Sequence, residues 1–200
     1  MKRQCPQCGN VETIPDDNRG PSHPCESCGT AISVPKEPLA KGIVTGEFVL
    51  ESALGDENGY SVWRGRHLKL KREVQLKICA LGDDKAYKKL QHEAGILAQL
   101  NNPLIPHIYT HGTDQELCYM ATEYLEGTTV DEIVGDRGPV AARRASDIIS
   151  TVAETLFELW MVDKFIHGAI EPAHILITPK GRIKLIGFSS AAMQGAGYGA

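Results

Sequence analysis

Four cysteines near the N-terminus constrain this chain more than any other feature. Cys5 and Cys8 form one C-x-x-C pair, Cys25 and Cys28 form a second, and sixteen residues separate the two pairs. Each C-x-x-C turn can direct two thiolates at one metal ion, and two such turns complete a tetrahedral site with four sulfur ligands. The spacing therefore predicts a structural metal site formed by these four cysteines.

Zinc is the metal that this ligand set indicates first. Four thiolates leave no open coordination position, so metal catalysis is not expected. Iron accepts the same geometry, so the sequence leaves zinc and iron both open. Disulfides or redox-active pairs are the alternatives, and the glycine after each pair, Gly9 and Gly29, argues against them because such turns let backbone amides face the sulfurs. His23 is a competing ligand, although a loop histidine is the simpler interpretation.

The two cysteine pairs belong to a near-repeat. Each pair is followed by a short segment that ends in Ile-Pro or Val-Pro, at residues 14–15 and 34–35. Two similar hairpins are expected, and residues 1–35 resemble a zinc ribbon. Residues 36–45 are expected to be a linker, because this region has prolines and lysines without apolar periodicity. The second domain is expected to start near Ile43 and to occupy residues 46–200.

The charge balance and the lack of long apolar runs exclude two classes of partner. The chain has 21 Lys and Arg against 25 Asp and Glu, a net charge of −4, so no nucleic acid partner is expected. No signal peptide and no run of about 18 apolar residues occurs, so no membrane segment is expected. A cytoplasmic location follows. Cys79 and Cys118 lie singly in apolar segments and are interpreted as buried core residues.

From residue 46 onwards the pattern favours strands first and helices later. Three β-branched or alternating segments, residues 46–55, 60–68 and 72–81, predict an antiparallel meander. A helix is predicted over about residues 83–100, with Asp83 or Asp84 as its cap and with apolar residues spaced at four and three. The apolar residues that define this spacing are Leu90, Ala94 and Leu97.

Later segments predict further strands and the most secure helix in the chain. Residues 105–112 and 117–124 predict two more strands, and the longest periodic stretch, about 140–162, predicts a long helix. Its apolar face carries Ile149, Val152, Ala153, Leu156 and Trp160. Two short strands are then expected around the turn at residues 179–182.

Several motifs in this order resemble the eukaryotic-like protein kinase family. The lysine of the V-Q-L-K segment, Lys77, is similar to the family's V-A-I-K lysine, which holds the α- and β-phosphates of ATP. Glu93 lies in a segment similar to the family's αC helix, whose glutamate pairs with that lysine. Thr122 stands at the gatekeeper position, and Glu123 to Leu125 match the hinge that binds adenine. These residues form the nucleotide site that the resemblance implies.

The resemblance covers about residues 46–191 and implies an α+β protein kinase-like fold. This fold has a five-stranded antiparallel N-lobe with the αC helix and a partial helical C-lobe, here preceded by the zinc ribbon. The resemblance also implies that this chain keeps the family's regulatory spine, a row of packed side chains in the core. The spine positions are Leu97, Ile108, His167 and Phe188.

The glycine-rich loop departs from the family pattern G-x-G-x-x-G-x-V. Gly55 and Val62 match the two ends of the pattern, while Glu57 and Tyr60 replace its second and third glycines. A carboxylate and a bulky ring oppose phosphate binding, since the family closes bare backbone over the phosphates. Gln75 replaces the alanine that forms the roof of the adenine pocket. These departures lower the expected affinity for ATP.

The catalytic loop departs further from the pattern H-R-D-L-K-P-E-N. Ala169 stands where an aspartate would accept the substrate proton, and Glu171 replaces the lysine that neutralises the transferred phosphate. His174 and Gly187 replace the asparagine and the aspartate that hold Mg²⁺ in the family. The resemblance therefore assigns no catalytic residue, and Mg²⁺ binding is not expected.

The resemblance implies a catalytically inactive module, a pseudokinase, that acts in signalling as a protein-interaction scaffold or regulator. One alternative is a divergent serine/threonine-kinase-like enzyme that binds ATP through Lys77 and Glu93. Another is a nucleic-acid or translation-related binder built on the zinc ribbon. The family's A-P-E segment and later helices have no counterpart here, so we expect either a fragment of a longer parent chain or a shortened fold that buries its open helix face on a protein partner. The Gly and Ala tail is expected to be mobile.

Overall fold

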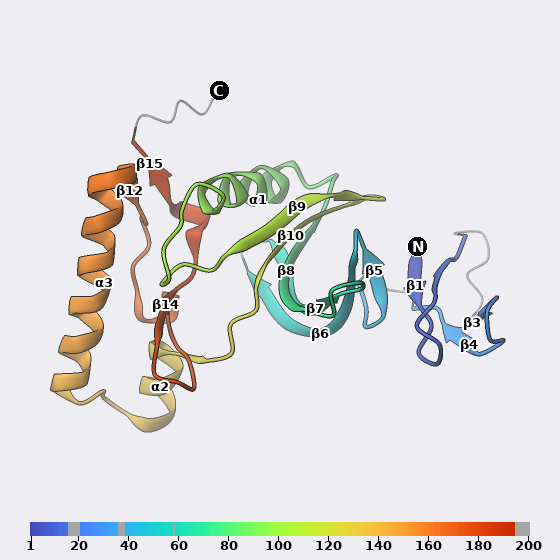
Figure 1. Cartoon of the computed structure of the whole chain (residues 1–200), viewed down its shortest axis with the longest axis horizontal. Coiled ribbons are helices and arrows are strands. Elements are labelled where there is room, and N and C mark those ends of the chain that lie inside the picture. Colours follow the sequence, from blue (N-terminus) through green and yellow to red (C-terminus); the bar gives the residue numbers. More distant parts are fainter. Residues whose placement is uncertain (16–20, 36–38, 58, 195–200) are drawn as a thin grey trace. The chain divides into compact units, whose positions relative to one another are not determined.

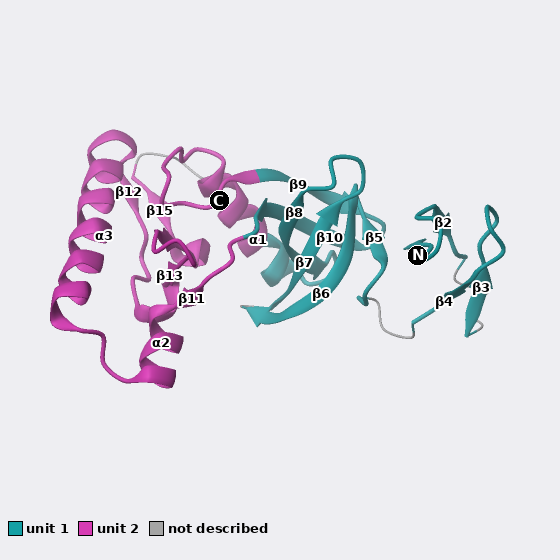
Figure 2. Cartoon of the chain, turned by 60° about the horizontal axis from the view of Figure 1, so that its bottom comes forward, with its two compact units in different colours: residues 1–88, 109–124 teal, residues 89–108, 125–200 magenta. Residues whose placement is uncertain are grey.

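The computed structural model describes residues 1–15, 21–35, 39–57 and 59–194 of the chain (Figure 1). The first three residues of the predicted linker, 36–38, and the Gly and Ala tail that follows Gln194 lie outside the described residues. The chain forms two compact units, coloured separately in Figure 2. The first contains residues 1–88 and 109–124, and the second contains residues 89–108 and 125–200.

The first unit is built on an eight-stranded sheet with the strand order β2-β1-β5-β6-β7-β8-β10-β9. The meander β6, β7 and β8 and the pair β9 and β10 confirm the five strands that the sequence predicts. The bounds are β1 Lys2–Gln4, β2 Val11–Thr13, β5 Ile43–Thr45, β6 Phe48–Glu57, β7 Tyr60–His67, β8 Glu73–Ala80, β9 Ile108–Asp114 and β10 Leu117–Glu123.

The core of this sheet follows from the period-two pattern of its strands. Val74, Leu76 and Ile78 alternate along β8, and all three are fully buried. Cys79 and Cys118 are directly opposite each other on β8 and β10 and are also buried, which confirms their interpretation as core residues. Burial raises the pKa of Cys79 to about 11, so this thiol stays protonated and unreactive at neutral pH. The core cluster consists of Ile43, Phe48, Leu50, Trp63, Val74, Leu76, Ile78 and Ala121.

The N-terminal segment forms the two hairpins that the near-repeat predicts. Strands β1 and β2 make the first hairpin, and β3 (Ser22–Pro24) and β4 (Ala31–Ser33) make the second. Ile14, Ile32 and Val34 form a small separate core with two of the cysteines. The near-repeat in the sequence thus corresponds to two equivalent hairpins around one cluster.

The first hairpin is hydrogen-bonded into the main sheet, which the sequence does not predict. Residues 43–45, given to the linker by the sequence analysis, form β5, and β5 pairs with both β1 and β6. Lys2 donates to both carboxylate oxygens of Asp114 at 2.9 and 3.0 Å, and Asp114 also accepts from the Gly46 N–H at 2.8 Å. Strands β1 and β5 are about forty residues apart, and such long-range pairing produces no periodic pattern in the sequence. Residues 43–45 were therefore assigned to the linker.

Helix α1 (Asp84–Leu97) begins as the sequence predicts. The Asp83 carboxylate accepts the Ala86 N–H at 3.0 Å, which makes Asp83, and not Asp84, the cap. Leu90, Ala94 and Leu97 are all buried, so the predicted spacing identifies the packed face correctly.

The second unit also contains two more helices and several short strands. Helix α2 (Val130–Arg137) is missing from the sequence prediction, although Thr129 and Glu132 form a capping box that its sequence encodes. The predicted strands around the turn at 179–182 are confirmed as β13 and β14. The remaining bounds are α3 Ala142–Asp163, β11 Thr128–Thr129, β12 Phe165–Ile166, β13 Ile175–Ile177, β14 Ile183–Leu185, β15 Ala192–Met193 and two 3-10 turns at Pro172–His174 and Phe188–Ser190.

The long helix α3 confirms the predicted helix, but of the five residues in the predicted apolar face only Val152 is buried. The buried residues are Ile148, Val152, Thr155 and Leu159, whereas Ile149 is 65% exposed. Both stripes have the same four-three-four spacing, and the polar Thr155 in the buried stripe makes the neighbouring stripe look more apolar. None of the described helices has the length and apolar composition needed to cross a bilayer.

Candidate functional site

Cross-strand register places Lys77, Glu57 and Tyr60 on one face of the sheet in the first unit. Lys77 of β8 lies opposite Val62, Val62 lies opposite Gly55 of β6, and Glu57 lies opposite Tyr60. Directly opposed residues share a face, and so do residues two apart along a strand. The three side chains therefore point to the same side of the β6–β7 hairpin and β8.

Lys77 is held by these two neighbours. Its Nζ lies 3.2 and 3.1 Å from the two carboxylate oxygens of Glu57 and 5.6 Å from the centre of the Tyr60 ring. The Lys77 side chain is 6% exposed and that of Glu57 is 34% exposed, while Tyr60 is fully buried. The ammonium thus has a carboxylate and an aromatic face as partners, which together satisfy a buried cation.

The other predicted nucleotide-site residues are divided between the two units. Val62 and Thr122 are buried in the first unit, and Gly55 has a φ of +139° beside Glu57. Glu93, which is 2% exposed, belongs to the second unit together with Leu125. The Lys77–Glu93 pair therefore stays a prediction. Glu123 pairs with Val74 at the end of β10, and Gln75 lies opposite Thr122.

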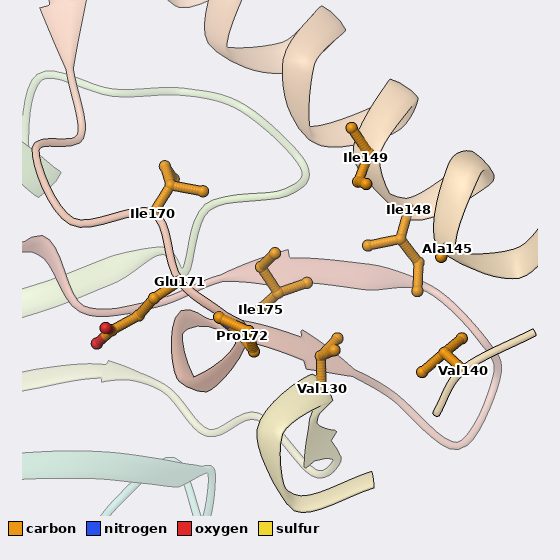
Figure 3. A pocket seen from close by; sticks show the side chains of 9 residues that line it. All are labelled: Val130, Val140, Ala145, Ile148, Ile149, Ile170, Glu171, Pro172 and Ile175. Carbon is orange, nitrogen blue, oxygen red and sulfur yellow. The ribbon is translucent and has the colours of Figure 1, made fainter. Parts of the chain in front are cut away.

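The predicted catalytic-loop positions come together in the second unit. His174 Nδ1 lies 2.7 Å from the carbonyl oxygen of Ala169 and 3.4 Å from a carboxylate oxygen of Glu171. Glu171 also borders an apolar cavity of about 250 Å³, and its carboxylate points away from Ile148 and Ile149 of α3 (Figure 3). Ala169 itself cannot act as a base, because its methyl side chain accepts no proton.

Gly187 and His174 stand at the two positions that bind Mg²⁺ in the family. The His174 ring leaves no room for a metal-binding side chain at position 187. Gly187 has a φ of +81°, and a Cβ built on it would lie 2.4 Å from His174 Cδ2 and 2.6 Å from Nε2. The imidazole therefore fills the space that an aspartate side chain would need. The residues present do not fit a Mg²⁺ ion, since neither Gly187 nor His174 offers the side-chain oxygen that Mg²⁺ prefers.

Two of the four predicted spine residues, His167 and Phe188, pack together in an aromatic cluster of the second unit. The rings of His167 and Phe188 are 4.8 Å apart, and Phe165 lies 6.1 Å from Phe188. Leu97, His167 and Phe188 are buried, and Ile108 is half-buried. His167 Nε2 lies 3.0 Å from the carbonyl oxygen of Ile186, which ties this loop to β14 and the following turn. These contacts are structural and need no reactive group.

The stability of the second unit is expected to fall as the pH is lowered from about 6.5 to about 4. Burial lowers the pKa of His167 from its usual 6.5 to about 4, and the unfolded chain therefore binds a proton in this window that the folded chain does not. The free energy of unfolding should fall by an amount on the order of 3 kcal/mol. Urea unfolding across this range should show a weaker pH dependence in His167→Gln than in the natural protein. The exposed His111→Gln should keep the natural dependence, and an unchanged slope in His167→Gln would contradict the assignment.

The four predicted metal ligands come together in the ribbon. The sulfur atoms of Cys5, Cys8, Cys25 and Cys28 all lie within 4.8 Å of one another, and two of the pairs are 3.7 and 3.6 Å apart. A tetrahedral zinc site with bonds of about 2.3 Å requires sulfur separations of about 3.8 Å. The donor set therefore fits a four-thiolate metal ion, and within the described residues the cluster does not include His23.

The two cysteine turns are built alike, as their sequence repeat predicts. Cys5 N–H donates to Asn10 O, and Gly9 N–H donates to Cys5 O; Cys25, Thr30 and Gly29 repeat this arrangement. Gly9 and Gly29 have φ of +76° and +73°, a conformation that other residues adopt at a cost. The glycines are thus needed for the turn itself, which places the sulfurs.

Two side chains next to the cysteines were not identified from the sequence. Thr30 Oγ1 lies 3.3 Å from Cys28 Sγ, and the Thr30 side chain and backbone lower the pKa of this thiol to about 6, which favours the thiolate that a metal binds. Glu12 Oε1 lies 3.3 Å from Cys25 Sγ and accepts from Asn10 and from the Glu26 N–H.

The ion pair of Glu57 with Lys77 was also not predicted, since the sequence analysis treats Glu57 only as a charge that repels phosphate.

Comparisons with known proteins agree with the arrangement of these elements. The model of the family described as protein kinase domain matches residues 48–198. The serine/threonine-protein kinase PknL of Mycobacterium tuberculosis is 26% identical over 156 residues, which cover 76% of this chain and 39% of PknL. PknB of Mycolicibacterium smegmatis is 31% identical over 151 residues, which cover 72% of this chain and 24% of PknB.

Two further comparisons concern length and fold. PrkC of Bacillus subtilis is 26% identical over 151 residues, which cover 74% of this chain and 23% of PrkC. The chain thus spans less than half the length of these curated relatives. The solved structure called PpkA-294 apo form superposes with a TM-score of 0.66 at 19% identity, and covers 76% of this chain and 62% of that one. At this identity the likeness concerns the fold alone.

Proposed function

This chain belongs to the protein kinase domain family, and from that premise we propose that it is a pseudokinase: a kinase-like module that transfers no phosphate and acts through protein interaction as a scaffold or regulator. The observation that carries the proposal is the ion pair between Lys77 and Glu57. The lysine that would hold ATP phosphates is bound instead by a carboxylate of the chain's own glycine-rich loop. Glu57 therefore competes with phosphate both by charge and by position.

The second unit supports the same proposal. Ala169 has no proton-accepting group, Glu171 carries a charge that repels phosphate, and Gly187 has no metal-binding side chain. Phosphoryl transfer depends almost wholly on positioning and charge neutralisation, and these replacements remove both contributions. In this proposal residues 1–35 bind a structural metal ion, for which zinc is the first candidate. Residues 46–200 form the kinase-like domain, and the protein is located in the cytoplasm.

An interaction role is supported by the exposed apolar residues of α3. Ile149, Phe157 and Val162 are 65%, 64% and 79% exposed, which is unusual for large apolar side chains on one helix. The partner in this proposal is a protein or a further part of a longer parent chain. The charge of −4 gives no support to a nucleic acid partner.

A divergent serine/threonine kinase is the second candidate, because the curated relatives bear the names of such kinases and because Lys77 and Glu93 are present. In this alternative Glu57 would leave Lys77 when ATP binds. The two candidates differ in what Glu57 does to nucleotide affinity and in whether phosphate is transferred.

We expect the natural chain to show no thermal shift with millimolar ATP, with or without Mg²⁺, and Glu57→Gln to gain affinity of roughly tenfold or more. The substitution removes a like charge and frees the ammonium for phosphate, an interaction worth about 1.5–3 kcal/mol. Isothermal titration calorimetry with ATP measures the change directly.

Asp56→Asn is the matched control, because it makes the same charge change one residue away at a carboxylate that contacts Ser61 at 2.9 Å. It should leave ATP affinity unchanged, and Lys77→Ala should abolish the gain in Glu57→Gln. A Mg²⁺-dependent shift in the natural chain, with transfer of ³²P from ATP to a protein substrate that Lys77→Ala abolishes, would establish the kinase alternative instead.

A further inference from the structure

The first unit has a cavity beside its curled sheet that the kinase-like site does not use. Its volume is about 350 Å³, within the range of small-molecule sites, and its walls come from the starts and ends of several strands. Four rings and two charged groups characterise the lining. They are Phe48, His67, Tyr109 and Tyr119, with Glu47 and Arg72.

The rings form a rigid aromatic wall. Phe48 contacts His67 edge to face at 5.1 Å and Tyr119 at 6.0 Å, and Phe48 is 2% exposed. Gly46 and Gly112 lie against the Tyr119 hydroxyl, where a Cβ on Gly46 would clash at 2.3 Å. Tyr109 and Tyr119 are only partly buried, so a part of each ring stays open to the cavity, which suits a flat ligand.

The negative charge at this cavity is already compensated. Glu47 lies 3.1 Å from Lys69 Nζ and 3.7 Å from His67 Nε2, and Lys69 lowers the pKa of Glu47. His67 Nδ1 accepts the N–H groups of Lys69 and Leu70, so its proton is on Nε2, toward Glu47. A cationic ligand would therefore meet a carboxylate whose charge is shared by two donors.

The positive charge, in contrast, is available. The Arg72 guanidinium lies 4.8 Å over the Tyr109 ring, and in the described ranges no carboxylate is paired with it. A guanidinium held on an aromatic face keeps its donors directed outward, and it binds carboxylate or phosphate through two parallel hydrogen bonds. The β7–β8 turn fixes its position, because His67 N–H donates to Arg72 O at 2.9 Å.

We propose that this cavity is a binding site for a small aromatic anion: a planar ring that packs between Phe48, Tyr109 and Tyr119, with an anionic group on Arg72. The ring accounts for the apolar walls, and the anion accounts for Arg72, the cation in this lining that is paired with no carboxylate among the described residues. The site is independent of the Lys77 region and of the metal ribbon, so it does not rest on the function proposed above.

Indole-3-acetate and tryptamine are suitable probes, since they carry the same ring with opposite charges. Titration of the ¹⁵N-labelled full chain should show indole-3-acetate binding in the millimolar range or tighter, with shifts at Tyr109, Tyr119 and the 68–72 turn. Tryptamine should bind at least about fivefold more weakly, because the site presents a cation. Equal or stronger binding of tryptamine would overturn the proposal.

Arg72→Gln should weaken indole-3-acetate binding about fivefold or more and leave tryptamine unchanged. Arg143→Gln, an exposed cation on α3, is the matched control and should have no effect. Tyr109→Leu removes the ring under the guanidinium and should weaken binding in the same way, as a second variant at this site. Unchanged affinity in both Arg72→Gln and Tyr109→Leu, or shifts confined to the apolar cavity beside α3, would refute the assignment.

Discussion

Removal of the metal from the four-cysteine site is expected to unfold residues 1–35 and to loosen strand β5 of the main sheet. Zinc binding by four thiolates contributes on the order of 10–16 kcal/mol to small ribbons, far more than the hydrophobic core formed by Ile14, Ile32 and Val34 can replace. The effect should extend to β5 because β1 pairs with it. Hydrogen exchange before and after chelation should show faster exchange at residues 2–4 and 43–45.

Substitution of single residues separates metal binding from other effects. Cys25→Ser should reduce the bound metal to well below half an equivalent and reproduce the exchange pattern, whereas Ser27→Ala, in the same turn but outside the ligand set, should retain the metal. Elemental analysis of freshly reduced protein gives the stoichiometry and also distinguishes zinc from iron. Full protection of β1 after complete removal of the metal would show that the ribbon folds without it.

Gly187→Asp, which restores the family's metal-binding aspartate, is expected to destabilise the second unit by roughly 2–4 kcal/mol. About 1 kcal/mol comes from the positive φ, and the remainder comes from the clash of the new Cβ with His174. His174 cannot move aside cheaply, since its Nδ1 bond to Ala169 O would be lost. Urea unfolding followed by circular dichroism gives the free energy of unfolding.

The clash can be separated from the backbone strain. Gly181→Asp introduces the same backbone strain, because Gly181 has a φ of +75°, but its Cβ would meet no atom within 4 Å. This substitution should therefore lower the free energy of unfolding by only about 1 kcal/mol. Gly187→Asp combined with His174→Asn should recover more than 1 kcal/mol relative to the sum of the two single changes. Strict additivity of the two substitutions would contradict the view that the imidazole fills the aspartate position.

The sequence predicts most of the fold because its strands and helices carry local periods. The alternation in β8 and the spacing of Leu90, Ala94 and Leu97 in α1 place these residues in the core correctly. In α3 the prediction placed Val152 correctly in the core but assigned the rest of the buried stripe one position too far along the chain, because the polar Thr155 lies in its middle. Helix α2 was missed because it buries no residue and so has no apolar period, although Thr129 and Glu132 mark its start.

The candidate sites show the same division between local and long-range information. The cysteine cluster follows from spacing alone, since two rigid turns define it. The contact between Glu57 and Lys77 depends on the register of three strands, which cannot be predicted from local sequence patterns. The sequence shows only that Glu57 replaces a glycine of the family pattern. The fit of His174 against Gly187 depends on two loops that meet in space, and no sequence pattern reports a steric clash.

The pairing of β1 with β5 also determines which strand edges of the sheet are open. Without the first hairpin, β5 would present unpaired N–H and C=O groups beside the long β6–β7 hairpin, and open strand edges are templates for the addition of strands from other molecules. With the hairpin in place, the described edge on that side is β2, which has three residues. Loss of a metal ion from the four-cysteine site would therefore also open this strand edge, and self-association of the chain should increase after chelation.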